Sequence, residues 1–407
     1  WAQEAGLHFF LDCHGPPGGC NTAQWCEGGK NKLWTDQDAQ ELMVAMWRRL
    51  ARRYRHHDRL LAYELMNEPS PPADYPLASY RDLCLCLIDA LREEDPGRPV
   101  VVTGLKWSGL AGLTDNIVLP RPGLIYTFHF YAPGEITHYR GGDYRYPGEV
   151  RIGARWIGNS PEDWGVEGES DWRLLEKSFT PPAGATVGKL MLRSSNNAGT
   201  AWFDDVELLA DGEPVVFSGN LSFDVAFRSH GWSVERQTAG EFTWDEREGH
   251  QQPGALRIKG TDSYNAWVCD NTFEVQSEAT YTMRCWVKAL GATGRTYPCV
   301  AWMEAGKEIL DRQWVERQIQ PAVEFRDKHG PVYCGEFGCS QSVPEESGTR
   351  WVKDVAEILN SKDLHWTYWN WRETTGPGSM GVWVKGPSGH YEPNGGLLEL
   401  MTQLWQQ

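Results

Sequence analysis

The sequence predicts an α/β protein: a (β/α)8 TIM barrel whose first two βα units are missing, with an inserted all-β jelly-roll sandwich. At both ends of the chain, short apolar runs alternate with amphipathic helical stretches, which is typical of βα units on a parallel sheet. In the middle, turn residues about every ten positions separate short alternating runs, which is typical of an antiparallel sandwich. A length of 407 residues accommodates a large barrel and a second domain.

The N-terminal third is expected to hold four strands and two helices. The predicted strands are 7–12, 60–66, 99–104 and 124–130. Thr35 is the predicted N-cap of the first helix, because Asp38 stands three residues further on and apolar residues then recur at helical spacing. The second helix is predicted over 79–94, where it stops at an Asp-Pro-Gly sequence.

The same alternation returns from about residue 309 and continues to the end of the chain. It predicts a helix to 328, a strand over 331–335, a helix over 349–360, a strand over 364–369 and a last helix from 397. These strands bring the total to six, whereas a closed barrel has eight, so about 80 further residues are expected before Trp1. The predicted barrel domain is 1–149 together with 309–407, and the inserted sandwich is 150–308.

Charge and composition exclude several classes of partner. The chain has 39 Lys+Arg against 55 Asp+Glu, a formal charge of -16, which repels nucleic acid and anionic membrane surfaces. No apolar run approaches the roughly 18 residues of a membrane span. The ten cysteines include no paired CxxC set, so no metal site is predicted from them, although Cys20 with Cys26, and Cys334 with Cys339, are close enough in sequence to bridge. The oligomeric state is not predicted.

Chemically active side chains follow the predicted strands. Catalytic groups of such barrels lie at the C-terminal ends of the strands, so these side chains are expected to share one mouth. Glu68 and Glu336 are the important pair, because glycosidic cleavage needs two carboxyl groups, one to protonate the leaving oxygen and one to attack or to activate water. Pro69 turns the chain after Glu68, and glycines on either side of Glu336 indicate tight backbone packing. The other candidates at these strand ends are His14, Asn67, His129, Tyr131 and Trp369.

Six motifs together resemble glycoside hydrolase family 5, the cellulase family of clan A. They are LDCHGPPGG at 11–19, LMNEP at 65–69, FHFYAP at 128–133, ITHYRGGDYRYPG at 136–148, YCGEFG at 333–338 and WTYWNW at 366–371. The resemblance covers roughly 1–148 and 309–407. It implies a secreted or periplasmic enzyme that acts on a polysaccharide with retention of configuration and without a cofactor.

The resemblance also implies roles for the candidate residues. Glu68 corresponds to the acid/base and Glu336 to the nucleophile. Asn67 would bind the sugar 2-hydroxyl, and His129 and Tyr131 would orient the two glutamates. His14 would line the cleft, and Trp369 would stack against the sugar that is cleaved. The family's arginine on the second strand has no match in this chain.

The insert resembles jelly-roll carbohydrate-binding modules of the family 4 and 9 type. The segment 172–209 matches their C-terminal half and 220–290 their N-terminal half, so the order is swapped and a circular permutation joined through 210–219 is expected. Exposed rings among Trp232, Trp244, Trp267 and Trp286 are candidates for glycan binding, with packing in the core as the alternative. The adjacent Asp204 and Asp205 either hold a structural calcium or end a strand.

These features favour a retaining β-glucan hydrolase, with endo-β-1,4-glucanase (cellulase) activity as the first choice. β-Mannanase and β-1,3-glucanase remain open, because loop residues decide the choice of polymer. A non-catalytic polysaccharide-binding protein is the alternative from another class, and a transglycosylase is distinguished only by its products.

Overall fold

The computed structural model divides the chain into two compact units. The first comprises Trp1–Tyr139, Arg145–Gly148 and Leu310–Gln407, and the second comprises Arg140–Tyr144 and Glu149–Ile309. The structure describes residues 2–72, 74–139, 144–215, 221–224, 231–235, 240–261, 264–373, 379–386 and 388–405, without the side chains of 151 and 152. None of the helices in these ranges has both the length and the apolar character needed to cross a membrane.

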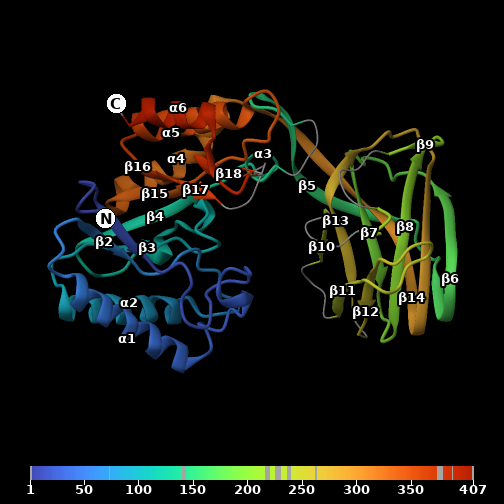
Figure 1. The fold of residues 1–407 in the computed structure, drawn as a ribbon, viewed down its shortest axis with the longest axis horizontal. Coiled ribbons are helices and arrows are strands. Elements are labelled where there is room, and N and C mark those ends of the chain that lie inside the picture. Colours follow the sequence, from blue (N-terminus) through green and yellow to red (C-terminus); the bar gives the residue numbers. More distant parts are fainter. Residues whose placement is uncertain are drawn as a thin grey trace. The chain divides into compact units, whose positions relative to one another are not determined.

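A six-stranded parallel sheet forms the centre of the first unit (Figure 1). Its strand order is β1-β2-β3-β4-β15-β16, so strands before and after the insert lie side by side where β4 pairs with β15. The bounds are β1 Phe9–Asp12, β2 Leu60–Glu64, β3 Val100–Thr103, β4 Leu124–Phe130, β15 Val332–Phe337 and β16 His365–Tyr368. All six predicted strands are present, each within two residues of its predicted ends. The sheet is a partial barrel.

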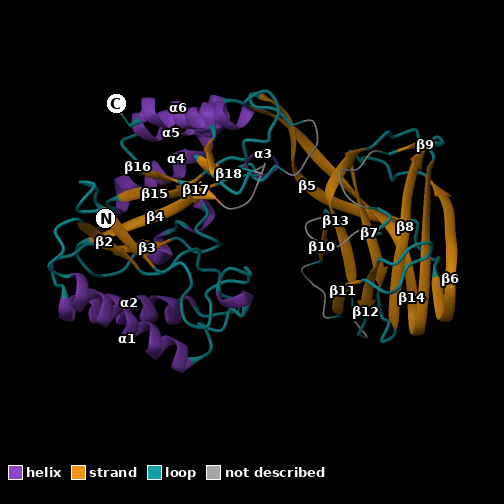
Figure 2. Ribbon diagram, in the orientation of Figure 1, coloured by secondary structure: helices purple, strands orange, loops and turns teal. Residues whose placement is uncertain are grey.

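Helices flank this sheet. Figure 2 shows α1 and α2 along one side of the strands and α4, α5 and α6 along the other. Their bounds are α1 Gln37–Tyr54, α2 Leu77–Glu94, α4 Arg312–His329, α5 Ser347–Ser361 and α6 Gly395–Leu404, with a single turn α3 Gly134–Thr137 and short 3-10 turns at Glu27–Gly29, Leu110–Gly112 and Asp115–Ile117. A small sheet of β17 Arg372–Glu373, β18 Trp383–Lys385 and β19 Tyr391–Pro393 completes the unit.

Asp36, and not the predicted Thr35, caps the first helix. Its carboxylate accepts a hydrogen bond from the backbone N–H of Ala39 at 3.2 Å. A carboxylate at this position satisfies a free N–H and also interacts favourably with the positive end of the helix dipole. Asp311 caps α4 in the same way, through the N–H of Trp314 at 2.8 Å.

The helices bury apolar faces against the sheet. On α1 the buried residues recur at three- and four-residue spacing, which directs one stripe inward: Ala39, Met43, Trp47 and Ala51. The indole N–H of Trp47 donates to the carbonyl of Leu65 at 3.1 Å, so this large side chain leaves no polar atom unsatisfied. All four residues of β3 are buried, as expected for a strand covered on both faces.

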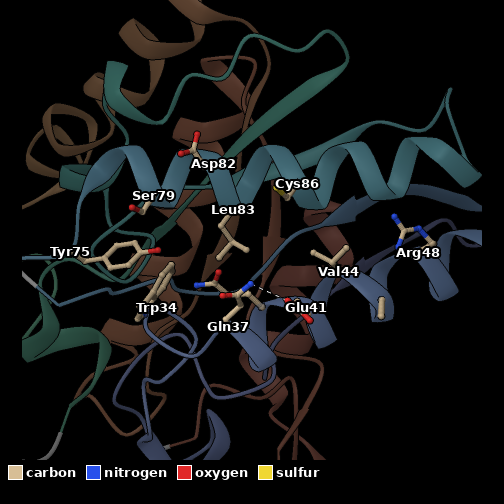
Figure 3. A pocket seen from close by; sticks show the side chains of 12 residues that line it. Trp34, Gln37, Glu41, Val44, Arg48, Tyr75, Ser79, Asp82, Leu83 and Cys86 are labelled. Carbon is tan, nitrogen blue, oxygen red and sulfur yellow. Dashed lines mark hydrogen bonds between the residues drawn. The ribbon is translucent and has the colours of Figure 1, made fainter.

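A groove of about 640 Å³ lies between α1 and α2 (Figure 3). Trp34 and Tyr75 form one end, with ring centroids 5.3 Å apart, and Arg48 lies toward the other. None of the residues that line the groove is among the candidate site residues, which follow the strands rather than the helices.

The second unit is an antiparallel β structure. Its strands are β5 Gly148–Ser160, β6 Val166–Phe179, β7 Val187–Ser194, β8 Thr200–Ala210, β9 Glu213–Pro214, β10 Trp232–Val234, β11 Glu241–Asp245, β12 Ala255–Lys259, β13 Ala266–Glu274 and β14 Tyr281–Leu310. The strands of the predicted sandwich form one antiparallel ten-stranded sheet. The reason is the long strand β14, which pairs with β8 through 281–290 and with β7 through 296–303. Residues 216–219 of the expected permutation joint, and parts of the matching segment 220–290, lie outside the described residues.

Aromatic side chains of this unit mostly fill its core. Trp232 and Trp267, two of the predicted candidates for exposed rings, are buried in the central apolar cluster, because they face inward between paired strands. Trp244 packs partly buried against the same cluster, and one face of the Trp286 ring is stacked on His250 with centroids 3.5 Å apart. Glycan binding by this unit through these four residues would therefore depend on Trp244 and Trp286.

The adjacent carboxylates Asp204 and Asp205 are both bound to His250. Asp204 accepts its backbone N–H at 2.7 Å, and Asp205 lies 3.0 Å from its Nδ1. Burial raises the pKa of Asp204 to about 7. Within the described residues, neither carboxylate belongs to a cluster of three or more potential metal ligands, so the calcium interpretation gains no support here.

Candidate active site

The structure brings the predicted site residues together at the C-terminal edge of the parallel sheet. His14 follows β1, Asn67 and Glu68 follow β2, and Trp369 follows β16. His129 and Tyr131 lie at the end of β4, and Glu336 is the next-to-last residue of β15. Parallel strands end at the same edge, and residues far apart in sequence therefore meet there.

The two glutamates both approach one nitrogen of the same imidazole. Nδ1 of His129 lies 2.9 Å from Oε1 of Glu68 and 3.4 Å from Oε2 of Glu336. One ligand atom from each of these three residues lies within 4.8 Å of the others. The two carboxyl groups are therefore too close for the roughly 6.5–9.5 Å separation of inverting glycosidases, and they fit the retaining arrangement of about 5–5.5 Å.

The electrostatics of the pair follow from burial and from its neighbours. Burial raises the pKa of Glu336, and the nearby charge of Glu68 adds to the shift. His129 and the hydroxyl of Tyr131, which donates to Glu336 at 2.9 Å, act in the opposite direction by stabilising the carboxylate. Burial lowers the pKa of His129, but its bond to Glu68 and the charges of both glutamates outweigh burial, so the net pKa of His129 is raised.

His14 connects the carboxyl pair to the aromatic part of the site. Its Nδ1 lies 2.9 Å from Asp12, its Nε2 lies 3.3 Å from the side-chain amide of Asn67, and its ring stacks on Trp369 with centroids 5.3 Å apart. Burial lowers the pKa of His14, but the bond to Asp12 and the other carboxylates of the site outweigh it and raise the pKa overall. Trp369 is held at the strand end by a backbone bond from its N–H to the carbonyl of Phe337 at 2.9 Å.

Glycines on both sides of Glu336 allow close packing there, as the sequence indicated. A Cβ at Gly335 would lie 2.4 Å from Oγ1 of Thr127 and 3.4 Å from the His129 ring. A Cβ at Gly338 would lie 2.3 Å from the carbonyl oxygen of Trp369. Any side chain at either position would displace the strand that carries Glu336 or the residues next to it.

Sequence reasoning missed a second layer of polar residues beneath the glutamate pair. Glu64 is only 6% exposed, pairs in register with Asp12 across the β1–β2 ladder, and accepts a hydrogen bond from the hydroxyl of Tyr333 at 2.6 Å. The available signal was a carboxylate inside an apolar strand, LLAYELM, where a polar residue must have a partner. The cysteine pairs that are close enough in sequence to bridge do not do so: all ten thiols are free, and Sγ of Cys20 lies 3.8 Å from Sγ of Cys26.

Glu64 should make the stability of the barrel unit depend on pH. Burial, together with the charge of Asp12, raises the pKa of Glu64 to about 7, which is above its unfolded value. The hydrogen bond from Tyr333 and the charge of His129 act to lower this pKa, and the charge of Glu336 acts to raise it. The folded chain therefore binds the proton more tightly, so the stabilisation is full below the unfolded pKa and is lost as the pH rises toward 7. In Glu64→Gln we expect the loss of unfolding free energy between pH 5 and pH 8 to be smaller by about 2 kcal/mol.

Urea unfolding of both proteins at the two pH values measures this difference. Glu41→Gln, at an exposed position on α1, is the matched control and should keep the parent's pH dependence. Equal pH dependence in the parent and in Glu64→Gln would contradict the prediction.

The same three side chains that form the catalytic candidate also offer ligands to a metal. Glu68, His129 and Glu336 form the one such group found in the described part of the chain. The atoms that would bind an ion already contact one another, since Nδ1 of His129 is shared by both carboxylates. The resemblance to family 5 implies no metal, so the geometry is interpreted as an acid/base and nucleophile pair.

A partial (β/α) barrel that presents two adjacent glutamates at its strand ends has the fold and site of a retaining glycoside hydrolase. Residues 1–161 match the model of the family described as Cellulase (glycosyl hydrolase family 5). Over these residues the chain is similar to glycosyl hydrolase family 5. The matched segment contains Glu68 but ends before Glu336, whose assignment depends on the geometry.

Similar curated proteins carry the names of glycosidases. Endoglucanase C of Acetivibrio thermocellus is 26% identical over 172 residues, which are 40% of this chain and 48% of the relative. Probable glucan 1,3-beta-glucosidase A of Aspergillus fumigatus is 36% identical over 105 residues, 25% of each chain. Beta-xylosidase of Phanerodontia chrysosporium is 31% identical over 101 residues, 24% of this chain and 21% of the relative. The chain spans about half the length, 48%, of the endoglucanase relatives that it matches.

Similar solved structures include one described as a glycoside hydrolase, with a TM-score of 0.47 and 15% identity over 99% of this chain and 77% of that chain. Cel5A of Thermotoga maritima in complex with cellobiose has a TM-score of 0.45 and 15% identity over 98% of this chain and 74% of that chain.

Proposed function

We propose that this protein hydrolyses a β-linked glucan by double displacement, with Glu336 as nucleophile and Glu68 as acid/base. The observation that carries the proposal is the closeness of the two carboxyl groups, which both approach Nδ1 of His129. This separation matches the arrangement in which a carboxylate itself attacks the sugar, rather than the wider one that holds a water between base and sugar.

In the first step the carboxylate of Glu336 attacks the anomeric carbon, and the bond to the leaving oxygen breaks. The proton of Glu68 moves to that oxygen, so the leaving sugar departs as an alcohol and Glu68 becomes a carboxylate. Tyr131 already donates to Oε2 of Glu336 and so holds this carboxylate in place for attack.

In the second step Glu68 removes a proton from water, and the resulting hydroxide attacks the anomeric carbon of the glycosyl ester. The ester bond breaks, Glu336 is released as a carboxylate, and Glu68 is again protonated. Two inversions give net retention. His129, whose pKa is raised, supplies positive charge beside whichever glutamate is ionised.

The proposed substrate is β-1,4-glucan cleaved within the chain, because the relatives matched over 172 residues are named endoglucanase C and endoglucanase C307. β-1,3-Glucan is a second candidate, because the relatives named glucan 1,3-beta-glucosidase share a higher identity of 36% over a shorter segment. Trp369 and His14 would form the sugar platform in either case. A polymeric substrate of this kind also supports a location outside the cytoplasm.

Product analysis on a panel of polymers tests this function. Carboxymethyl-cellulose, laminarin, mannan and xylan are each incubated with the parent chain and with Glu336→Gln, and reducing ends are measured. We expect Glu336-dependent release from carboxymethyl-cellulose, with the β-anomer appearing first by NMR. Release from another polymer would make that polymer the substrate in place of β-1,4-glucan. An α-anomer as the first product would overturn the retaining mechanism. Binding without any release would favour a non-catalytic polysaccharide-binding protein.

A further inference from the structure

The loop after β1 holds the backbone of the proposed acid/base residue. The amide Nδ2 of Asn21 donates to the carbonyl oxygen of Glu68 at 3.0 Å, and the thiol of Cys20 donates to the carbonyl of Asn67 at 3.1 Å. The N–H of Ser70 in turn donates to the carbonyl of Cys20 at 2.9 Å. Cys20 and Asn21 thus donate to the consecutive carbonyls of Asn67 and Glu68.

Glu68 needs such support, because its backbone is in an uncommon conformation. Its φ of 49° lies in the left-handed region, which is unfavourable for a residue with a side chain. The following Pro69 restricts the same residue further and contributes no backbone N–H to a turn. A conformation of this kind persists only where neighbouring groups fix it.

Asn21 is built to supply this support. Its side chain is completely buried, at 0% exposure, and Oδ1 accepts the N–H of Ala23 at 3.0 Å. That contact fixes the orientation of the amide, so the NH2 group must point at Glu68. The nearby bond from the N–H of Asn67 to the carbonyl of Cys13, at 3.0 Å, holds the residue before Glu68 from the other side.

We propose that Asn21 is a positioning residue for general-acid catalysis, which holds the carbonyl of Glu68 so that its carboxyl group reaches the leaving oxygen. The inference rests on the proposed function. Asn21 itself does not touch the carboxyl group of Glu68 or Glu336 in the hydrogen bonds of the described residues. Its effect is transmitted through the backbone of Glu68.

The test compares substrates that differ in their need for an acid. Asn21→Asp replaces the donor by an oxygen, and Asn21→Ser keeps an oxygen that can accept from Ala23 but removes the amide. For both variants, kcat/KM is measured on phenyl and 2,4-dinitrophenyl β-cellobiosides. We expect a loss of about 10²-fold on the phenyl glycoside, whose leaving group must be protonated, and less than about 3-fold on the dinitrophenyl glycoside.

Asn31→Asp is the matched control. Asn31 lies in the same loop and donates to Ser70 at 3.3 Å, not to Glu68, so any loss should be equal on both substrates. Equal losses in the Asn21 variants, no loss in them, or failure of both to fold as judged by circular dichroism would overturn the positioning role. A parent chain without Glu336-dependent cleavage of either glycoside would instead overturn the proposed function on which the role depends.

Discussion

Glu336→Gln is expected to lower kcat by about 10⁴-fold or more on every substrate that the parent chain cleaves. The amide of glutamine is a poor nucleophile, so the glycosyl ester does not form, and this loss is independent of the leaving group. The Tyr131 hydroxyl can donate to the amide oxygen of glutamine as it does to the carboxylate, so the fold should be retained. The measurement is initial-rate kinetics on polymer and on 2,4-dinitrophenyl β-cellobioside.

Covalent trapping provides the corresponding positive result. A 2-deoxy-2-fluoro glycoside with a dinitrophenolate leaving group should add one glycosyl mass to the parent chain, on the peptide that contains Glu336, and none to Glu336→Gln. Glu345→Gln, at an exposed glutamate that pairs with Arg145, is the control and should be labelled like the parent. Labelling at Glu68, or unimpaired turnover by Glu336→Gln, would show that the nucleophile has been assigned incorrectly.

Glu68→Ala is expected to reduce kcat/KM by about 10²- to 10⁴-fold on polymer, because the leaving oxygen then departs without a proton. On 2,4-dinitrophenyl β-cellobioside the first step should remain close to the parent rate, while the second step becomes limiting because water has lost its base. The glycosyl-enzyme should therefore accumulate and give a burst of dinitrophenol. Stopped-flow absorbance measures the burst.

Azide separates an acid/base role from a general loss of structure. A small anion can occupy the space left by the Glu68 carboxyl group, attack the glycosyl-enzyme without a base, and restore turnover with β-glycosyl azide as product. Glu27→Ala, at an exposed glutamate in the loop after β1, should show neither burst nor rescue. Rescue that yields α-glycosyl azide would be inconsistent with retention.

The parts of the fold and site that sequence predicts well are those set by local pattern. Each strand of the parallel sheet is part of a short apolar run bounded by polar residues, and the candidate catalytic groups lie at or shortly after the ends of these strands. Parallel strands end at the same edge of a sheet, so the positions of the strand ends in the sequence predict that Glu68, His129 and Glu336 lie close together. The structure brings these three within hydrogen-bond reach.

The parts that could not be predicted depend on register and on distant partners. Glu64 lies beside Asp12 only because of how β1 and β2 align, and Tyr333 reaches it from a strand 269 residues away. Asn21 is 47 residues from the carbonyl that it binds. Similarly, the alternation around Trp267 indicates that one face of the strand is buried, but it does not indicate which face. The long strand β14 pairs with both β7 and β8, and no local sequence pattern encodes these pairings.

In a chain of residues 1–407, the two outer strands of the parallel sheet affect how copies behave together in solution. Within the described residues, β1 and β16 each have a strand on one side only, and the free N–H and C=O groups of an edge strand can pair with another chain. The net charge of -16 opposes such encounters. That repulsion reaches about 10 Å at 0.1 M salt but only about 3 Å at 1 M. Colloidal stability is therefore greatest at low ionic strength, and adding salt shifts the balance toward edge-to-edge association.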